Sequence, residues 1–206
     1  MSRNLDPMGP SPGTQPGANL DKPAWRERLR SQLGSLPPDQ AARNAAQMAD
    51  AALTLPEVTR GAGILICLSF GDEIDTWGLV QRLRDLGKAV FVPRVQRKGM
   101  RLHVHRYPCP LRRLSFGLRQ PAADSPAVPE GEILDHVHVA LVTGLGFDRR
   151  GIRLGYGGGY FDRFFARVPI PRIGMAHHLQ LVETLPRDPH DLPMAAVVTE
   201  SGVHRP

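Results

Sequence analysis

The apolar residues of this chain follow two patterns, and each predicts a different kind of secondary structure. The stretches 63–68 (GILICL) and 137–142 (VHVALV) are short and almost wholly apolar. Such runs are typical of strands buried on both faces, as in parallel sheets. Residues 101–106 alternate between polar and apolar, which indicates a strand with one exposed face. On these patterns we predict strands over 63–68, 88–93, 101–106, 137–142, 171–176 and 195–199.

Between the strands, apolar residues recur at helical spacing. Trp25, Leu29 and Leu33 fall on one row of a helix. Asn19 or Asp21 can cap this helix, which ends near residue 33. We predict further helices over 39–53, 76–86 and 158–166. Because strands alternate with helices, we expect an α/β fold, in a single domain with a largely parallel open sheet flanked by helices.

Composition separates the first residues from the rest of the chain. Residues 1–18 contain four prolines and three glycines but almost no large apolar side chain. We predict that they form a disordered tail, because such a segment buries too little apolar surface to offset the entropy of ordering. Residues 19–206 are predicted to form one catalytic domain, in which 107–131, rich in Pro, Arg and Gly, are mostly loop.

Several classes of protein are excluded at this point. The chain has no apolar run of 18 residues and no basic region followed by an apolar core, so we expect neither a membrane span nor a secretory signal. With only Cys67 and Cys109, it has neither a disulfide framework nor a CxxC zinc site. We therefore expect a reducing, cytoplasmic location and no membrane partner.

The charge of the chain points to an anionic ligand. The formal net charge is +6, and all but three of the 26 cationic side chains are arginine. Arginine makes bidentate contacts to phosphate and carboxylate, so a nucleotide, a polycarboxylate or a nucleic acid would fit. The arginines between residues 94 and 113 permit nucleic-acid binding, but the chain has no RRM, KH or zinc-finger pattern. We expect no nucleic-acid partner. Another sugar-phosphate or acyl-group enzyme on a similar sheet stays open.

Residues 144–163 (GLGFDRRGIRLGYGGGYFDR) are the most informative stretch. Four of the five residues from 155 to 159 are glycine, between a predicted strand and a predicted helix. Such a loop allows backbone N–H groups to converge on an anion. Arg149, Arg150 and Arg153 precede it, and Asp162 follows where it can hold a divalent cation beside bound phosphates. The loop is neither a dinucleotide fingerprint, since position 160 is Tyr160, nor a Walker A motif.

The stretch 146–163 resembles the signature of the 5-formyltetrahydrofolate cyclo-ligase family, also called methenyltetrahydrofolate synthetases. Three shorter segments resemble the family in the same order along the chain: 22–26 (KPAWR), 69–76 (SFGDEIDT), and the pair 185–191 (LPRDPHD) with 197–200 (VVTE). The resemblance covers about residues 20–201. The chain departs from the family pattern at Thr143, where proline is usual, at Phe161, where tyrosine is common, and at Ala195, where an acidic residue is frequent.

The resemblance implies an enzyme that converts 5-formyltetrahydrofolate to 5,10-methenyltetrahydrofolate with ATP and Mg²⁺. In this reaction the formyl oxygen attacks the γ-phosphate, N10 attacks the activated carbon, and ADP and phosphate are released. Phosphoryl transfer depends mostly on positioning and charge stabilisation, which fits a chain without a nucleophile motif. The substrate is 5-formyltetrahydrofolate, with or without a polyglutamate tail, and we expect a monomer.

The resemblance also implies which residues form the site. Arg153 and Tyr160 would be catalytic, and Asp162 and Asp191 would hold the metal. The substrate would contact Leu68, Glu73, Tyr156, Gly157, Gly158, Gly159 and Tyr160. ATP would contact Lys22, Arg26, Arg153, Leu154, Gly155, Tyr156, Gly157, Gly158, Gly159, Tyr160 and Phe161.

Some of these residues have an alternative interpretation as structural residues. Lys22, Arg26 and Arg30 repeat at four-residue spacing, which also fits a solvated helix face, and we keep that interpretation for Arg30. Leu68 also fits an ordinary core position. Asp75 is predicted to cap the helix that begins near residue 76.

Overall fold

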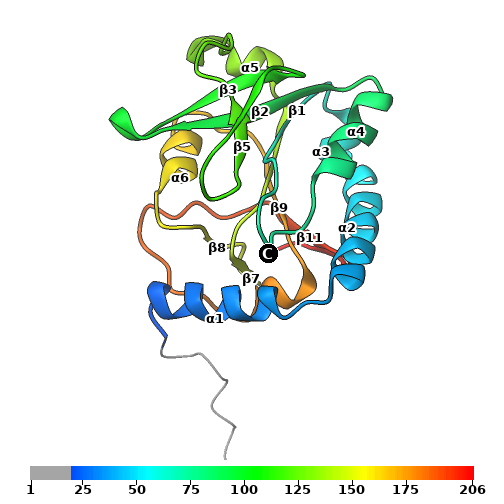
Figure 1. Ribbon diagram of the computed structural model, residues 1–206, viewed down its shortest axis with the longest axis vertical. Coiled ribbons are helices and arrows are strands. Elements are labelled where there is room, and N and C mark those ends of the chain that lie inside the picture. The colour runs from blue at the N-terminus through cyan, green and yellow to red at the C-terminus, as the bar shows by residue number, and fades with distance from the viewer. Residues whose placement is uncertain (1–19) are drawn as a thin grey trace, which may run out of the picture.

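The fold is built on a seven-stranded sheet in the computed structural model, which describes residues 20–206 (Figure 1). The strand order is β12-β11-β9-β6-β1-β2-β3. The five inner strands are parallel to one another, whereas the two edge strands, β3 and β12, pair antiparallel. The predicted α/β class and largely parallel sheet are therefore confirmed. The strands are β1 (Gly63–Ile66), β2 (Ala89–Gln96), β3 (Arg101–Tyr107), β6 (Val139–Val142), β9 (Arg172–Met175), β11 (Ala196–Thr199) and β12 (Gly202–His204).

Helices cover both faces of this sheet, and one further helix crosses its lower end (Figure 1). Side chains of α2, α3 and α4 share one apolar cluster with the sheet, and those of α5 and α6 share another. The helix α1 belongs to neither cluster and packs on residues near the site instead. The helices are α1 (Lys22–Gly34), α2 (Pro38–Leu53), α3 (Pro56–Arg60), α4 (Trp77–Asp85), α5 (Ile133–His136) and α6 (Tyr160–Phe165).

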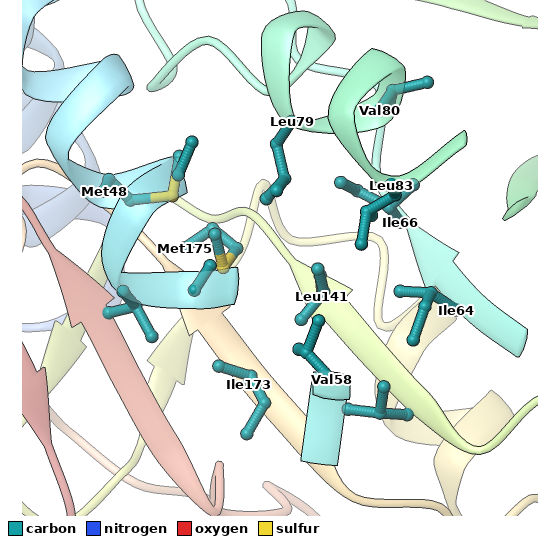
Figure 2. Packing of buried hydrophobic residues seen from close by; sticks show 14 of the residues in the cluster. Met48, Val58, Ile64, Ile66, Leu79, Val80, Leu83, Leu141, Ile173 and Met175 are labelled. Carbon is teal, nitrogen blue, oxygen red and sulfur yellow. The ribbon is translucent and has the colours of Figure 1, made fainter. Parts of the chain in front are cut away.

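The strand β1 shows why a wholly apolar run forms an inner strand. Its four residues are all buried. Ile64 and Ile66 point into the cluster beneath α2 and α4 (Figure 2), and Leu65 points into the cluster on the opposite face. Since successive side chains of a strand alternate between faces, only apolar residues at every position satisfy both clusters. Each such side chain contributes about 1.5–3 kcal/mol by leaving water.

The first helix lies where its pattern predicts. Asp21 is the N-cap, and its carboxylate accepts a hydrogen bond from the Ala24 N–H at 2.9 Å. Trp25, Leu29 and Leu33 are its buried residues. Trp25 and Leu29 share a cluster with Ile152 and Leu154, which precede the glycine run, and with Leu185. The alternative cap, Asn19, and the predicted disordered tail lie outside the described residues.

The structure differs from the prediction where strands are very short. Within the predicted loop 107–131, β4 (Leu111–Arg113) and β5 (Arg119–Pro121) form a hairpin. The predicted glycine-rich turn contains β7 (Gly146–Asp148) and β8 (Arg153–Leu154), which form a small second sheet with β10 (Leu181–Val182). Two or three residues carry too little periodicity for a prediction, and their pairing depends on distant partners. Within residues 20–206, no helix has the length and apolar character needed to cross a bilayer.

Candidate functional site

A cavity of about 540 Å³ opens where the neighbouring strands β1 and β6 end. Cys67 and Leu68 follow β1, and Thr143 follows β6. The carboxyl ends of parallel strands are the usual place for a ligand in such sheets. All the predicted site residues line this cavity: Lys22, Arg26, Leu68, Glu73, Arg153, Leu154, Gly155, Tyr156, Gly157, Gly158, Gly159, Tyr160, Phe161, Asp162 and Asp191. Residues that the resemblance placed in one site therefore meet in one cavity.

The glycine run forms one wall of the cavity, and its conformation requires glycine at two positions. Gly157 has φ of 101° and Gly159 has φ of 61°, which L residues rarely adopt. Gly155 lies directly against the Arg153 guanidinium, since a Cβ there would lie 2.7 Å from Nη1 of Arg153. The Arg26 Nε donates a hydrogen bond to the Gly155 carbonyl at 2.9 Å, so α1 holds the start of the loop.

Arg153 is the cation most deeply buried in this wall, with a side chain only 7% exposed. Its Nη2 lies 3.7 Å from Asp162 Oδ2, a long contact for an ion pair, and its guanidinium lies 5.0 Å from the centre of the Phe161 ring. Its buried Nε has no hydrogen-bond partner within residues 20–206. A buried, incompletely paired guanidinium at the edge of a cavity favours an anionic ligand.

Arg149 and Arg150, the two other arginines that precede the glycine run, do not contribute to the cavity, which corrects the prediction that they support an anion site there. Arg149 pairs with the exposed Glu183 at 2.9 Å. Arg150 pairs with the fully buried Asp148 at 2.7 Å. Neither lines the cavity. Sequence proximity was misleading here, because the β7–β8 hairpin reverses the chain between these arginines and Arg153.

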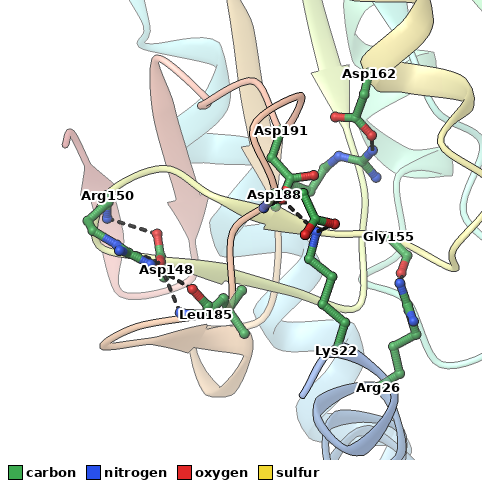
Figure 3. A network of polar contacts seen from close by, with 10 residues as sticks. Lys22, Arg26, Asp148, Arg150, Gly155, Asp162, Leu185, Asp188 and Asp191 are labelled. Atoms are coloured by element: carbon green, nitrogen blue, oxygen red, sulfur yellow. Dashed lines mark hydrogen bonds and ion pairs between the residues drawn. The ribbon is translucent and has the colours of Figure 1, made fainter. Parts of the chain in front are cut away.

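A second wall of the cavity carries an ion-paired cluster of Lys22, Asp188 and Asp191 (Figure 3). The Lys22 Nζ lies 2.7 Å from Asp188 Oδ2 and 2.6 Å from Asp191 Oδ2. Burial alone would lower the pKa of Lys22, but its hydrogen bonds to Asp188 and Asp191 raise that pKa above its ordinary value. The same hydrogen bond from Lys22 lowers the pKa of Asp188. Lys22 thus stays charged at neutral pH.

Asp188, His190 and Asp191 present ligand atoms that all lie within 4.8 Å of one another. The sequence had predicted Asp191 as a metal ligand together with Asp162, but Asp162 is not part of this group. Asp188 was missed. Its position three residues before Asp191, in a proline-flanked loop, was the available signal, and its role depends on a contact with Lys22 across 166 residues.

Glu73 lies on the floor of the cavity and is 8% exposed. Its Oε1 accepts a hydrogen bond from the Tyr156 hydroxyl at 3.0 Å. Burial raises the pKa of this carboxyl from 4.5 to about 7, although hydrogen bonds from Thr143 and Tyr156 act in the opposite direction. Near neutral pH Glu73 therefore exchanges readily between its charged and neutral forms. Asp75, predicted as a helix cap, accepts a hydrogen bond from the Trp77 N–H at 2.8 Å.

Aromatic side chains extend the cavity beyond Glu73. The Phe70 ring lies 5.6 Å from that of Phe116 and 5.3 Å from that of Tyr156. Phe116, at the tip of the β4–β5 hairpin, was missed because its segment was predicted as loop. Arg30 is exposed, as predicted for a solvated helix face. Its guanidinium also lies 5.9 Å from the centre of the Tyr156 ring and lines the cavity, a contact that the sequence did not predict. Leu68 lines the cavity and packs in the core. Its core interpretation is therefore confirmed, and its contact with the substrate stays a prediction.

Known proteins are similar to this chain over nearly its whole length. The model of the 5-formyltetrahydrofolate cyclo-ligase family matches residues 18–200. The 5-formyltetrahydrofolate cyclo-ligase of Escherichia coli K12 is 33% identical over 183 residues, which cover 85% of this chain and 98% of that protein. The mouse 5-formyltetrahydrofolate cyclo-ligase is 25% identical and covers 89% and 96%.

A solved structure shows the same fold. The NMR structure of 5,10-methenyltetrahydrofolate synthetase from Aquifex aeolicus superposes with a TM-score of 0.76, at 27% identity, and covers 89% of this chain and 92% of that one. The structure of the Mycoplasma pneumoniae 5,10-methenyltetrahydrofolate synthetase, at 17% identity, agrees in fold with a TM-score of 0.68. The chain therefore belongs to the 5-formyltetrahydrofolate cyclo-ligase family of enzymes.

Proposed function

We propose that this chain converts 5-formyltetrahydrofolate to 5,10-methenyltetrahydrofolate at the cost of one ATP. Family membership supports the reaction class. The observation that carries the proposal for this chain is Arg153. Its buried guanidinium has an unpartnered Nε and faces the cavity beside the glycine run. Charge that develops on a transferred phosphoryl group is stabilised by such a preorganised cation.

Phosphates are proposed to bind between the two walls that carry cations. Lys22 and Arg26 come from α1, and Arg153 comes from β8. Gly157 and Gly159 allow the loop backbone to approach an anion closely, since neither has a side chain in the way. Charge-assisted contacts of this kind contribute about 1.5–3 kcal/mol each.

The folate is proposed to bind at the end of the cavity formed by Glu73, Leu68 and the aromatic rings. When ionised, Glu73 accepts hydrogen bonds from N–H donors of the pterin. Phe70, Phe116 and Tyr156 offer apolar surface of a size that suits flat rings. The formyl group would then lie between this end and the phosphate end, which the reaction requires.

In the proposed reaction, the formyl oxygen attacks the γ-phosphate and ADP leaves. N10 then attacks the activated carbon and loses its proton, and phosphate departs with the former formyl oxygen. Arg153 stabilises the negative charge on the transferred group throughout, and Tyr160 lines the same part of the cavity. No side chain needs to form a covalent bond, in agreement with a site that offers cations and no activated nucleophile.

The acidic groups of the cavity fit Mg²⁺, which prefers carboxylate oxygens together with phosphate oxygens and water. Lys22 engages Oδ2 of both Asp188 and Asp191, which leaves Oδ1 of each carboxylate for a cation. Asp162 offers a further carboxylate beside Arg153. When bound, the cation would neutralise phosphate charge. The monomeric state and the cytoplasmic location stay predictions.

An absorbance assay tests the proposal. The methenyl product has its own absorption band, and its appearance is expected to require both ATP and 5-formyltetrahydrofolate. The Arg153→Ala variant is the matched control, because it removes the buried guanidinium and leaves Lys22 and Arg26 in place. An increase in absorbance without ATP, or an unchanged rate in Arg153→Ala, would contradict the proposal.

A further inference from the structure

Asp148 is the one charged residue of the described chain with no exposed surface. It ends β7, and its carboxylate accepts five hydrogen bonds. Oδ1 accepts from the backbone N–H groups of Arg150 and Ile152, both at 2.9 Å. Oδ2 accepts from Arg150 Nη2 at 2.7 Å, from Arg150 Nε at 3.0 Å and from the Leu185 N–H at 3.0 Å. A carboxylate that accepts this many hydrogen bonds holds its donors in place.

These donors belong to two segments that are far apart in sequence. The Ile152 N–H directly precedes Arg153, which starts the cavity wall that carries the glycine run. Leu185 starts the segment that leads to Asp188 and Asp191, which line the second wall. Arg150 reinforces the link, because its Nη2 also donates to the Leu185 carbonyl at 2.7 Å (Figure 3).

The contacts of Leu185 show that this link reaches the site. The Leu185 side chain is 1% exposed and packs in the cluster of Trp25 and Leu29, on the buried face of α1. Lys22, on the same helix, pairs with Asp188 and Asp191. A shift at Leu185 would therefore move both the carboxylates and the lysine relative to Arg153.

We propose that Asp148 and Arg150 form a positioning pair that sets the distance between the Arg153 wall and the Lys22–Asp188–Asp191 wall. The pair touches no substrate and acts through Leu185 on one side and Ile152 on the other. The part of this proposal that concerns ATP rests on the proposed function. A misplacement of about 1 Å in a site that depends on positioning can reduce the rate about a hundredfold.

Neighbouring arginines provide the variants and the control. Arg150→Ala removes two side-chain hydrogen bonds to Asp148 and one to the Leu185 carbonyl. Arg150→Lys keeps the charge beside Asp148 but loses the fork that also reaches the Leu185 carbonyl. Arg149→Ala is the control, because Arg149 pairs only with the exposed Glu183 through its side chain. Asp148→Asn is the second approach, since an amide presents N–H groups toward the donors of Arg150 or Leu185.

The first readout needs no ligand. Hydrogen exchange of the amides in 185–191 is expected to be at least about tenfold faster in Arg150→Ala than in the wild type, with Arg150→Lys in between. Exchange in β1 is expected to stay unchanged, which shows that the fold is intact. Arg149→Ala should match the wild type in both segments. Equal exchange in 185–191 for Arg150→Ala and the wild type would overturn the proposal.

The second readout is calorimetric affinity for ATP with Mg²⁺. Arg150→Ala is expected to weaken ATP binding about tenfold, to leave KM for 5-formyltetrahydrofolate within about twofold, and to be partly rescued by Arg150→Lys. In a double-mutant cycle, Arg150→Ala and Asp191→Ala should be non-additive, because one acts through the other. Additive effects would overturn the link to the site. A wild type that binds no ATP refutes the proposed function but leaves the exchange result intact.

Discussion

Glu73→Gln is expected to stabilise the protein at alkaline pH while it impairs the site. A carboxyl whose pKa rises from 4.5 to about 7 on folding binds its proton more tightly in the folded state. Its neutral form therefore favours folding, and this advantage is lost as pH rises from 4.5 through about 7. At 1.36 kcal/mol for each tenfold change in the ionisation constant, the ionised Glu73 costs about 3 kcal/mol of stability.

The two oxygens of Glu73 accept from the Phe70 N–H and the Tyr156 hydroxyl, respectively. Glutamine keeps one oxygen, which can accept from the Phe70 N–H, and its NH2 group can donate to the Tyr156 hydroxyl oxygen, but it never ionises. Above pH 8, the free energy of unfolding of Glu73→Gln is therefore expected to exceed that of the wild type by about 3 kcal/mol. For a chain of this length, that difference raises Tm by about 6–12 °C. Near pH 5 the two proteins should differ little.

Urea denaturation at pH 5 and pH 8.5 measures this difference. Burial lowers the pKa of three histidines, His103, His105 and His177. These histidines are common to both proteins, so any contribution that they make to the pH dependence cancels. Glu183→Gln is the control, because Glu183 is exposed and pairs with Arg149 on the surface. A stability difference between Glu73→Gln and the wild type that is the same at both pH values would refute the reasoning. The variant should also raise KM for 5-formyltetrahydrofolate and leave ATP affinity nearly unchanged.

Three further substitutions test the two walls of the cavity. Lys22→Ala is expected to weaken ATP binding about tenfold or more in calorimetry, since one charge-assisted contact is worth about 1.5–3 kcal/mol; Lys98→Ala, in an exposed turn, should have no effect. Gly157→Ala and its control Gly202→Ala each introduce a side chain at positive φ, 101° and 120° respectively, so both should lower Tm by similar amounts. Only Gly157→Ala should also reduce kcat, by about tenfold. Asp162→Asn should reduce activity and regain part of it in excess Mg²⁺, which a titration of the rate against Mg²⁺ measures.

The parts of the fold that could be predicted are those in which local pattern and burial agree. The apolar run of β1 is buried on both faces, and the row of Trp25, Leu29 and Leu33 forms the buried side of α1. The β4–β5 hairpin and the β7–β8–β10 sheet could not be predicted, because their strands have two or three residues each and pair with partners up to 34 residues away. Within the glycine run, the pattern alone could not show which positions are left-handed, and the structure places them at Gly157 and Gly159.

The same distinction holds for the site. Functional residues that lie in one segment of the sequence could be predicted, and those that depend on a contact between distant segments could not. The glycine run, Arg153 and Asp162 occupy one stretch of sequence, so their pattern was visible there. Asp188 gains its partner only because α1 crosses the lower end of the sheet and brings Lys22 to it.

Arg150 shows the reverse case. Its charge and its place beside the loop suggested phosphate binding, yet the buried carboxylate of Asp148 claims its guanidinium. A buried charge is stable only when it is paired with an opposite charge. The buried Asp148 carboxylate therefore determines that Arg150 forms an ion pair within the protein and does not face a ligand. Arg150 is therefore held by Asp148, away from the cavity. Arg153 lines the cavity, is buried and is not fully partnered, so an incoming anion would stabilise it most.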